Sequence, residues 1–251
     1  MPDPGPEGVD AASPDSGRAA VRVAVDAMGG DRGAEAVVAG AREAASADVV
    51  PVLFGSPELD AAGLELVPTT QVVGMDEKPA DAFRSKRDSS LVRAVQAVAD
   101  GQAAAVVSPG NTGAVLTAGL VLLRRLPAVR RPAIAVPIPA RRGPCVLVDA
   151  GANADCRPEH LLQFAVMGAV FAEELLGVAR PQVRLLSIGE EPEKGNQLAL
   201  EAHRLLAASD LDFRGNAEGR DILAGAADVL VTDGFTGNVA LKTVEGTIRT
   251  L

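Results

Sequence analysis

One glycine-containing loop carries the residues best suited to chemistry. Residues 108–113 (SPGNTG) follow the apolar run 103–107 and precede an apolar segment that begins at about Ala114. Turn-forming residues with hydroxyl and amide side chains are typical of a tight loop between a strand and a helix. Asn111 is expected to cap that helix, and the glycines allow the backbone to approach a ligand closely. The unpaired N–H groups of the first helical turn then favour an anion, either a phosphate or a developing oxyanion.

Three other loops repeat parts of this pattern. Residues 231–237 (VTDGFTG) echo 107–113 (VSPGNTG), while 25–30 (VDAMGG) and 148–151 (VDAG) share an aspartate and glycine after an apolar strand. Ligands of an open parallel sheet bind beyond the carboxyl ends of its strands, so we expect the four loops to line one crevice. Glycine and a polar cap are also what any strand-to-helix turn requires. The sequence pattern shared by the four loops favours a binding site.

Strand and helix patterns alternate along almost the whole chain. Strands are expected at 21–25, 49–54, 64–67, 103–107, 183–188 and 229–231, with a strand pair at 133–136 and 145–148 around the basic turn 140–143. Helices are expected at 33–46, 89–100, 114 onward, 158–176, 195–208 and from Asn238, with polar loops at 74–80 and 215–221. This alternation predicts an α/β protein with a doubly wound, mostly parallel sheet.

Composition narrows the function classes. Apolar residues make up 47% of the 251 residues but aromatic ones only 2%, so the core must be built from Ala, Val and Leu, as suits buried parallel strands. The net charge of −9, without a block of basic residues, argues against nucleic acid as a partner. The two cysteines have neither the spacing of metal ligands nor that of a disulfide framework, so we expect the protein in the reducing cytoplasm. No apolar run reaches the roughly 18 residues of a membrane span. Residues 1–20 are expected to form a disordered tail.

Sequence patterns for common cofactors and metals are missing. Residues 28–33 (MGGDRG) do not form the G-x-G-x-x-G pattern of dinucleotide-binding loops, and no glycine loop ends in Gly-Lys-Ser/Thr. No histidine pairs with Glu or His at the spacing of zinc proteases. We therefore expect neither a metal nor a bound cofactor.

Other polar segments leave two interpretations open. Cys156 and His160 are four residues apart, which suits a thiol nucleophile with its base, or a buried thiol beside a packed histidine. Residues 189–196 (GEEPEKGN) also allow two interpretations. Lys194 and Asn196 could bind phosphate oxygens, or the segment with its glutamates could form a solvated turn. The same choice between ligand contact and solvated surface applies to Asn216 and Glu218. Several arginines are either solvated or form a docking surface for an acidic partner. They are Arg124, Arg125, Arg130, Arg131, Arg141 and Arg142.

Five ordered motifs resemble the bacterial phosphate acyltransferase family, the acyl-ACP:phosphate transacylases of phospholipid synthesis. They are residues 25–33 (VDAMGGDRG), 108–120 (SPGNTGAVLTAGL), 148–165 (VDAGANADCRPEHLLQFA), 188–196 (IGEEPEKGN) and 232–246 (TDGFTGNVALKTVEG). The resemblance implies that acyl-ACP (acyl carrier protein) and inorganic phosphate give acyl phosphate and free ACP. The product would feed a membrane glycerol-3-phosphate acyltransferase. It also implies a three-layer α/β/α sandwich like isocitrate and isopropylmalate dehydrogenases, usually a homodimer, in the cytoplasm and peripherally at the membrane.

This chemistry agrees with the residues themselves. A thioester is already activated, so the protein needs only to bind phosphate, aim it and stabilise the tetrahedral oxyanion. Backbone amides at 111–113 and 236–238 suit that task, with Lys194 or Lys242 adding charge, while Asp26, Asp31, Asp149 and Asp233 orient the loops. The expected catalytic residues are Asn111, Thr112, Lys194 and Asn238. The expected phosphate- or acyl-binding residues are Asp26, Gly29, Gly30, Gly110, Gly113, Asn153, Asn196, Asn216, Asp233, Gly237 and Lys242.

Two departures from the resembled family and three rival functions remain. Family members usually have alanine where Pro109 stands, and they continue through further helices, so residues 21–251 are expected to be a C-terminally truncated domain. The truncated chain is expected to be less stable and less active than one carrying those helices. The rivals are a phosphotransacetylase acting on acyl-CoA, a dehydrogenase that would need a metal and a nucleotide, and an inactive relic that only binds ACP or a partner.

Overall fold

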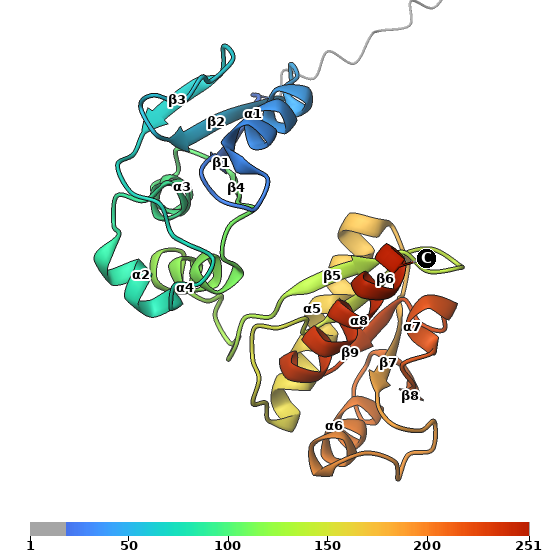
Figure 1. Cartoon of the computed structure of the whole chain (residues 1–251). Helices are drawn as coiled ribbons and strands as arrows, with labels where there is room; N and C mark the ends of the chain where they lie inside the picture. The colour runs from blue at the N-terminus through green and yellow to red at the C-terminus, as the bar shows by residue number, and fades with distance from the viewer. Residues whose placement is uncertain (1–18, 251) are drawn as a thin grey trace, which may run out of the picture. The chain divides into compact units, whose positions relative to one another are not determined.

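The computed structural model describes residues 19–250, so most of the predicted tail at 1–20 lies outside the described residues (Figure 1). Strands and helices alternate through this part of the chain, which confirms the predicted α/β class. The chain divides into two compact units, the first ending at Leu123 and the second starting at Arg124. The strands accordingly belong to two sheets rather than to the single sheet expected from the sequence, one sheet in each unit.

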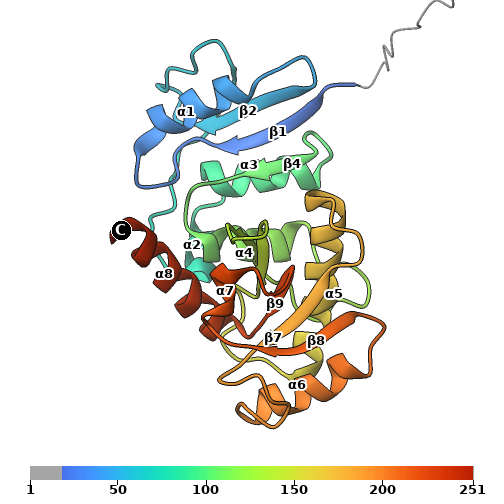
Figure 2. The ribbon, with the colours of Figure 1, turned by 90° about the vertical axis from the view of Figure 1, so that its right-hand side faces the viewer.

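The first unit is built on a parallel sheet. Within its described residues four strands pair in the order β3-β2-β1-β4. They are β1 (Val21–Asp26), β2 (Val49–Gly55), β3 (Glu65–Pro68) and β4 (Ala105–Val107). Helix α1 (Gly33–Ala44) packs on the face that carries Val25 and Leu53, and α3 (Ser90–Ala99) covers the face of Ala24 and Val52. Figure 2 shows α1 and α3 on opposite sides of β1 and β2, as in a three-layer sandwich.

Two shorter helices complete this unit. Helices α2 (Pro79–Ser85) and α4 (Thr112–Leu122) pack with α3 around a buried apolar cluster that includes Phe83 and Leu91. The sequence predicted a polar loop at 74–80 and missed α2. Pro79 occupies the first turn of α2, where its fixed φ suits a helix and its missing N–H costs nothing.

The second unit carries a mixed sheet. Among residues 124–250 five strands pair in the order β5-β6-β9-β7-β8, with only the β5–β6 pair antiparallel. They are β5 (Ala135–Ile138), β6 (Cys145–Val148), β7 (Gln182–Leu186), β8 (Asp212–Ala217) and β9 (Val229–Val231). The predicted strand pair around the basic turn is confirmed. Strand β8 was missed because it lies at the sheet edge, where Asp212, Arg214 and Gly215 give it a polar sequence.

Helices cover both faces of this second sheet. Helices α5 (Pro158–Leu176) and α6 (Gln197–Ala207) pack with Phe164 and Leu206 against Val146, Val183 and Val229. On the other face lie the short α7 (Asp221–Ala224) and α8 (Gly234–Thr250). As predicted, α5 ends at Leu176, and Gly177 after it has φ +69°. Helix α8 begins at Gly234, four residues before the predicted Asn238, so the glycine-containing stretch 234–237 is its first turn.

Candidate functional site

Two of the predicted loops meet in the first unit. Strands β1 and β4 are parallel neighbours, so the loops that follow them leave the same edge of the sheet. Asp26, at the end of β1, is 1% exposed and accepts a hydrogen bond of 2.7 Å from the Ser108 hydroxyl after β4. The Ser108 oxygen in turn accepts from the Gly110 N–H at 3.2 Å. Ser108 thus joins the two loops, a role that sequence reasoning missed although Ser108 directly follows the strand.

Glycines permit the closest contact between these loops. A methyl group on Gly29 would lie 2.8 Å from the Gly110 nitrogen and 2.8 Å from Asp26 Oδ2. Gly30 has φ +88°, and a side chain there would meet Pro109 at 3.0 Å. Only glycine tolerates this combination of approach and conformation. The predicted residues Asp26, Gly29, Gly30 and Gly110 are therefore brought together.

Asn111 uses both ends of its side chain within the protein. Its Oδ1 accepts from the Ala114 N–H at 3.0 Å, which confirms the predicted N-cap of α4. Its Nδ2 donates to the backbone oxygens of Gly74, Met75 and Glu77 at 3.4, 3.1 and 3.2 Å. The Asn111 side chain therefore fixes the 74–77 loop against α4, and its contribution to an anion site is left to its backbone.

Backbone N–H groups at the start of α4 remain free. Among the described residues no hydrogen bond uses the N–H of Asn111, Thr112 or Gly113. Thr112 is exposed, and Gly113 packs closely on α2, since a methyl there would lie 2.6 Å from Pro79 Cγ. Three unpaired donors at the positive end of a helix dipole form a site for an anion. We call residues 111–113 the α4 cradle.

The second unit contains the other pair of loops, organised by Asp149. This carboxylate is fully buried at the end of β6 and accepts five hydrogen bonds. Oδ2 accepts from the backbone N–H and the side-chain amide of Asn153, both at 2.8 Å. Oδ1 accepts from three backbone N–H groups, those of Ile134, Gly151 and Ala152 at 3.1, 3.1 and 2.9 Å. Both oxygens of Asp149 and the amide of Asn153 are thus engaged in shaping the loop.

The first turn of α8 packs tightly on this loop. A methyl on Gly237 would overlap the Asp149 carbonyl oxygen, so only glycine fits. Asp233 caps the helix with two hydrogen bonds. Its Oδ1 accepts from the Thr236 N–H at 2.8 Å, and its backbone carbonyl accepts from the Gly237 N–H at 2.9 Å. These amides are therefore occupied, and the expectation that 236–238 offer backbone donors is wrong. Asn238 is exposed, and its side chain lies beside Gly151.

A small pocket lies where β7 and β9 end. It measures about 130 Å³. Asn196 caps α6 here by accepting from the Ala199 N–H at 2.9 Å, and the Thr232 side chain is buried. The pocket is lined by Leu161, Leu185, Leu186, Ser187, Ile188, Gly195, Asn196, Ala199, Thr232, Asp233 and Thr236. Of the predicted site residues, Asn196 and Asp233 are brought together here, and Lys194 precedes the lining residue Gly195. We call this the α6 pocket.

The remaining predicted residues have structural partners or lie apart. Asn216 is 2% exposed, and its Nδ2 donates to the Glu191 carbonyl at 2.8 Å, so it holds the 189–196 loop on β8. Lys194 is exposed. Lys242, along α8, pairs with Glu245 at 2.8 Å and is not among the residues that line the α6 pocket.

Cys156 and His160 do not form a nucleophile and base. The Cys156 thiol donates to the Asn153 carbonyl at 3.4 Å, and His160 Nδ1 accepts from the Arg157 N–H at 3.2 Å. Burial raises the pKa of the Cys156 thiol to about 11. Burial, followed by the charges of Arg131 and Arg157, lowers the pKa of His160. These contacts favour the packing interpretation.

No group of three or more His, Cys, Asp or Glu side chains in residues 19–250 is arranged to hold a metal ion. No helix in the same part of the chain combines the length and the apolar character needed to cross a membrane.

Comparison with known sequences gives close relatives. The sequence family described as "Fatty acid synthesis protein" matches residues 21–251. The phosphate acyltransferase of Desulforamulus reducens is 47% identical over 236 residues, which cover 90% of this chain and 71% of that protein. The enzyme of the same name from Halothermothrix orenii is 45% identical over 240 residues, covering 90% and 72%. That of Desulforudis audaxviator is 48% identical over 238 residues, covering 92% and 71%.

Comparison with solved structures gives the same fold. EutD phosphotransacetylase from Staphylococcus aureus aligns with a TM-score of 0.64 at 18% identity, covering 91% of this chain and 82% of that one. A branched-chain phosphotransacylase from Enterococcus faecalis aligns with a TM-score of 0.61 at 19% identity, covering 90% and 84%. At such low identity these likenesses show the fold alone, and they confirm the α/β class predicted from the sequence.

Proposed function

The chain belongs to the phosphate acyltransferase family, and on that premise we propose that it transfers an acyl group from acyl-ACP to inorganic phosphate. A phosphate oxygen attacks the thioester carbonyl carbon and forms a tetrahedral oxyanion. The C–S bond then breaks, the acyl phosphate is released, and the thiolate of ACP takes up the proton that phosphate loses. The observation that carries this proposal is the 47% identity to a phosphate acyltransferase over 90% of the chain.

The α4 cradle supports this reaction because it offers what a thioester needs. The substrate is already activated, so the protein has to orient phosphate and stabilise the oxyanion rather than supply a nucleophile. We assign this task to the free N–H groups of residues 111–113, held in place by Asp26 and Ser108. The high pKa of Cys156 supports direct attack by phosphate, since the neutral thiol is a poor nucleophile.

The assignment of ACP as the acyl donor rests on surface charge as well as on the family. In a chain of net charge −9, four exposed arginines lie close together in sequence, and within residues 19–250 none of them forms an ion pair with a carboxylate. They are Arg124, Arg125, Arg130 and Arg131. Unpaired guanidinium groups favour an acidic protein partner. We also propose that the protein works as a homodimer in the cytoplasm, peripherally at the membrane, and passes acyl phosphate to a membrane glycerol-3-phosphate acyltransferase.

The reaction is tested by following both products. Purified protein is mixed with acyl-ACP and phosphate, free thiol is titrated, and acyl phosphate is trapped with hydroxylamine. Phosphate-dependent formation of both products in equal amounts is expected. Turnover with acyl-CoA but not with acyl-ACP would instead support the phosphotransacetylase alternative, and no turnover with either donor would contradict the proposal.

A proline at the first helical position tests the cradle itself. Thr112→Pro removes one free N–H at a position where proline fits, because Asn111 before it is extended with ψ 109°. Loss of one oxyanion donor typically lowers turnover by about a hundredfold or more. Thr112→Ala, which keeps the N–H, should retain most activity.

Gln197→Pro makes the same change at the first position of α6, whose cap Asn196 is also extended. It is the matched control for α4. If Gln197→Pro abolishes turnover and Thr112→Pro does not, the anion binds in the α6 pocket and our assignment to α4 is wrong.

A further inference from the structure

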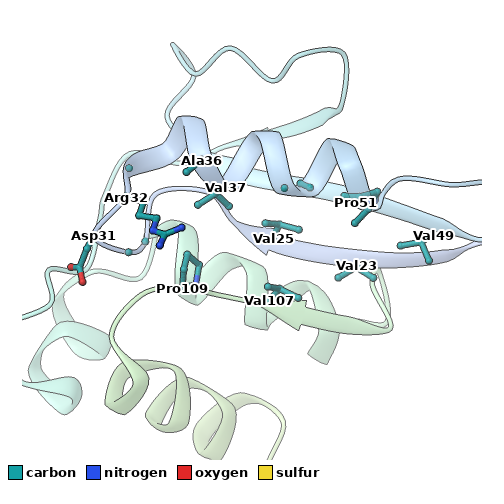
Figure 3. Close-up of a pocket in the computed structure, with 16 residues that line it drawn as sticks. Val23, Val25, Asp31, Arg32, Ala36, Val37, Val49, Pro51, Val107 and Pro109 are labelled. Carbon is teal, nitrogen blue, oxygen red and sulfur yellow. The ribbon is translucent and has the colours of Figure 1, made fainter. Parts of the chain in front are cut away.

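The α4 cradle is held in place from two sides. On one side Pro109, in the loop before the cradle, packs on Gly30 after β1, and Figure 3 shows Pro109 at the edge of the apolar groove between α1 and the sheet. On the other side the side-chain amide of Asn111 donates to the 74–77 loop. The cradle therefore keeps its position only while both neighbouring loops keep theirs.

The 74–77 loop is a turn that the Glu77 side chain closes. Glu77 Oε1 accepts from the Gly74 N–H at 2.6 Å and from Lys86 Nζ at 2.5 Å. Closure of the turn brings the backbone oxygens of Gly74, Met75 and Glu77 together around Asn111 Nδ2. Asparagine has a single NH2 group, so it contacts three carbonyls only where a turn makes them converge. The closed turn is thus what holds the Asn111 side chain.

Lys86 joins this turn to the chain in front of it. Its Nζ also donates to the Val72 carbonyl at 2.7 Å, so one ammonium group bonds the residue that begins the approach to the turn and the carboxylate inside it. The backbone of Lys86 is itself fixed to the end of α2, where its N–H donates to the Ala82 carbonyl at 2.9 Å. The hydrogen bond from Lys86, followed by that from the Gly74 N–H, lowers the pKa of Glu77, which is therefore ionised at neutral pH.

We propose that Lys86 and Glu77 are positioning residues for the α4 cradle. By closing the 74–77 turn they hold Asn111 Nδ2 while its Oδ1 caps α4, and the direction of the free N–H groups of residues 111–113 is fixed as a result. The inference rests on the proposed function, which places phosphate on the cradle. Neither side chain needs to touch the substrate, because both act through Asn111. Misplacement of reacting groups by about 1 Å can lower a rate about a hundredfold, so a loosened turn is costly for turnover.

Glu77→Gln separates positioning from simple charge. A carboxylate near the cradle repels phosphate, so loss of its charge alone would lower the KM for phosphate. The substitution also weakens the closed turn, because neutral hydrogen bonds are about half as strong as charge-assisted ones. Glutamine has nearly the same shape and its Oε1 still accepts from Gly74, so the variant is expected to fold. The proposal expects the KM for phosphate to rise at least about threefold. An unchanged or lower KM would overturn it.

Lys86→Met is the stronger variant, and Arg22→Met is its matched control. Methionine keeps the apolar stem of Lys86 but loses both hydrogen bonds, so the KM for phosphate should rise about tenfold or more. Arg22 likewise bonds a carboxylate, Glu65 at 2.8 Å, and a carbonyl, that of Gln102 at 3.2 Å, but it lies at the start of β1, away from the loops that follow the strands.

Arg22→Met removes the same charge as Lys86→Met, so it shows what loss of a positive charge does by itself. Its KM for phosphate should stay within about twofold of wild type, as for other surface substitutions. Loss of folded protein lowers the maximal rate but does not raise KM, so a merely structural role would leave KM unchanged. An unchanged KM in Lys86→Met would contradict the proposal, and so would an equal increase in Arg22→Met.

Binding of inorganic phosphate without turnover completes the test. In the 15N-labelled protein, phosphate should shift the amide signals of residues 111–113, and its affinity should be weaker in Glu77→Gln and Lys86→Met than in wild type and Arg22→Met. The positioning role and the reaction fail separately. Weaker phosphate binding in the two variants, without formation of acyl phosphate by any form of the protein, contradicts the proposed function alone. Formation of acyl phosphate with wild-type phosphate affinity in both variants contradicts the positioning role alone.

Discussion

Replacing Asp149 with asparagine removes one charge and almost no volume from the centre of the second unit. The wild-type carboxylate receives five N–H groups, three on Oδ1 and two on Oδ2, and it is fully buried. An asparagine amide has one oxygen and one NH2 group. Whichever way it is turned, its NH2 group faces donors, and at least two hydrogen bonds are lost.

The size of the effect follows from these two bonds. Hydrogen bonds to a charged group contribute about 1.5–3 kcal/mol each, so Asp149→Asn should destabilise the protein by about 3–6 kcal/mol. For a chain of this size each kcal/mol lowers the melting temperature by about 2–4 °C. The expected decrease is therefore at least about 6 °C, measured by calorimetry or circular dichroism.

Asp155→Asn provides the matched control. Asp155 lies in the same segment but is exposed, and no hydrogen bond of its side chain is found among the described residues. Its replacement should leave the melting temperature within about 1 °C, because surface substitutions rarely exceed 0.5 kcal/mol. If Asp149→Asn melts as late as Asp155→Asn, the five-donor arrangement does not stabilise the loop and the reasoning is refuted.

Three other predictions concern the remaining polar contacts. Asn111→Asp keeps the helix cap but loses the hydrogen-bond donors to the 74–77 loop, so it should lower the melting temperature. Asn196→Asp should not lower it, because the Asn196 side chain only caps α6. The hydrogen bond from Lys86 lowers the pKa of Glu77 below 4.5, so the stability it provides is complete above that pH and is lost as pH falls through the lower folded-state pKa. Melting curves of Glu77→Gln should therefore differ from wild type above about pH 5 and converge with it in more acidic buffer. With a thiol pKa of about 11, only about one Cys156 in a thousand is ionised at pH 8, so Cys156→Ser should keep most activity; a trapped acyl-cysteine would contradict this.

The fold could be predicted where local signals are strong. Alternating apolar runs and turn residues identified most strands, and Asn111 caps α4 as expected. The missed elements are those whose local signal is weak or ambiguous. Strand β8 is polar because it is an edge strand, and the sequence alone does not show which strand lies at an edge. Division into two sheets depends on pairing between distant segments, which periodicity does not encode.

The site was predicted at the level of loops but not of individual donors. Asn111 and Asn196 have the same sequence context, a polar residue before an apolar helix, and both are caps. Only the fold reveals that Asn111 also holds a loop more than 30 residues earlier in the chain. Likewise, residues 107–113 and 231–237 share a sequence pattern. Asp233 nevertheless accepts hydrogen bonds from backbone N–H groups of its own loop, whereas the N–H groups of residues 111–113 stay free. A repeated sequence pattern therefore predicts a repeated turn. Whether the turn binds a ligand depends on which of its donors the protein has already used.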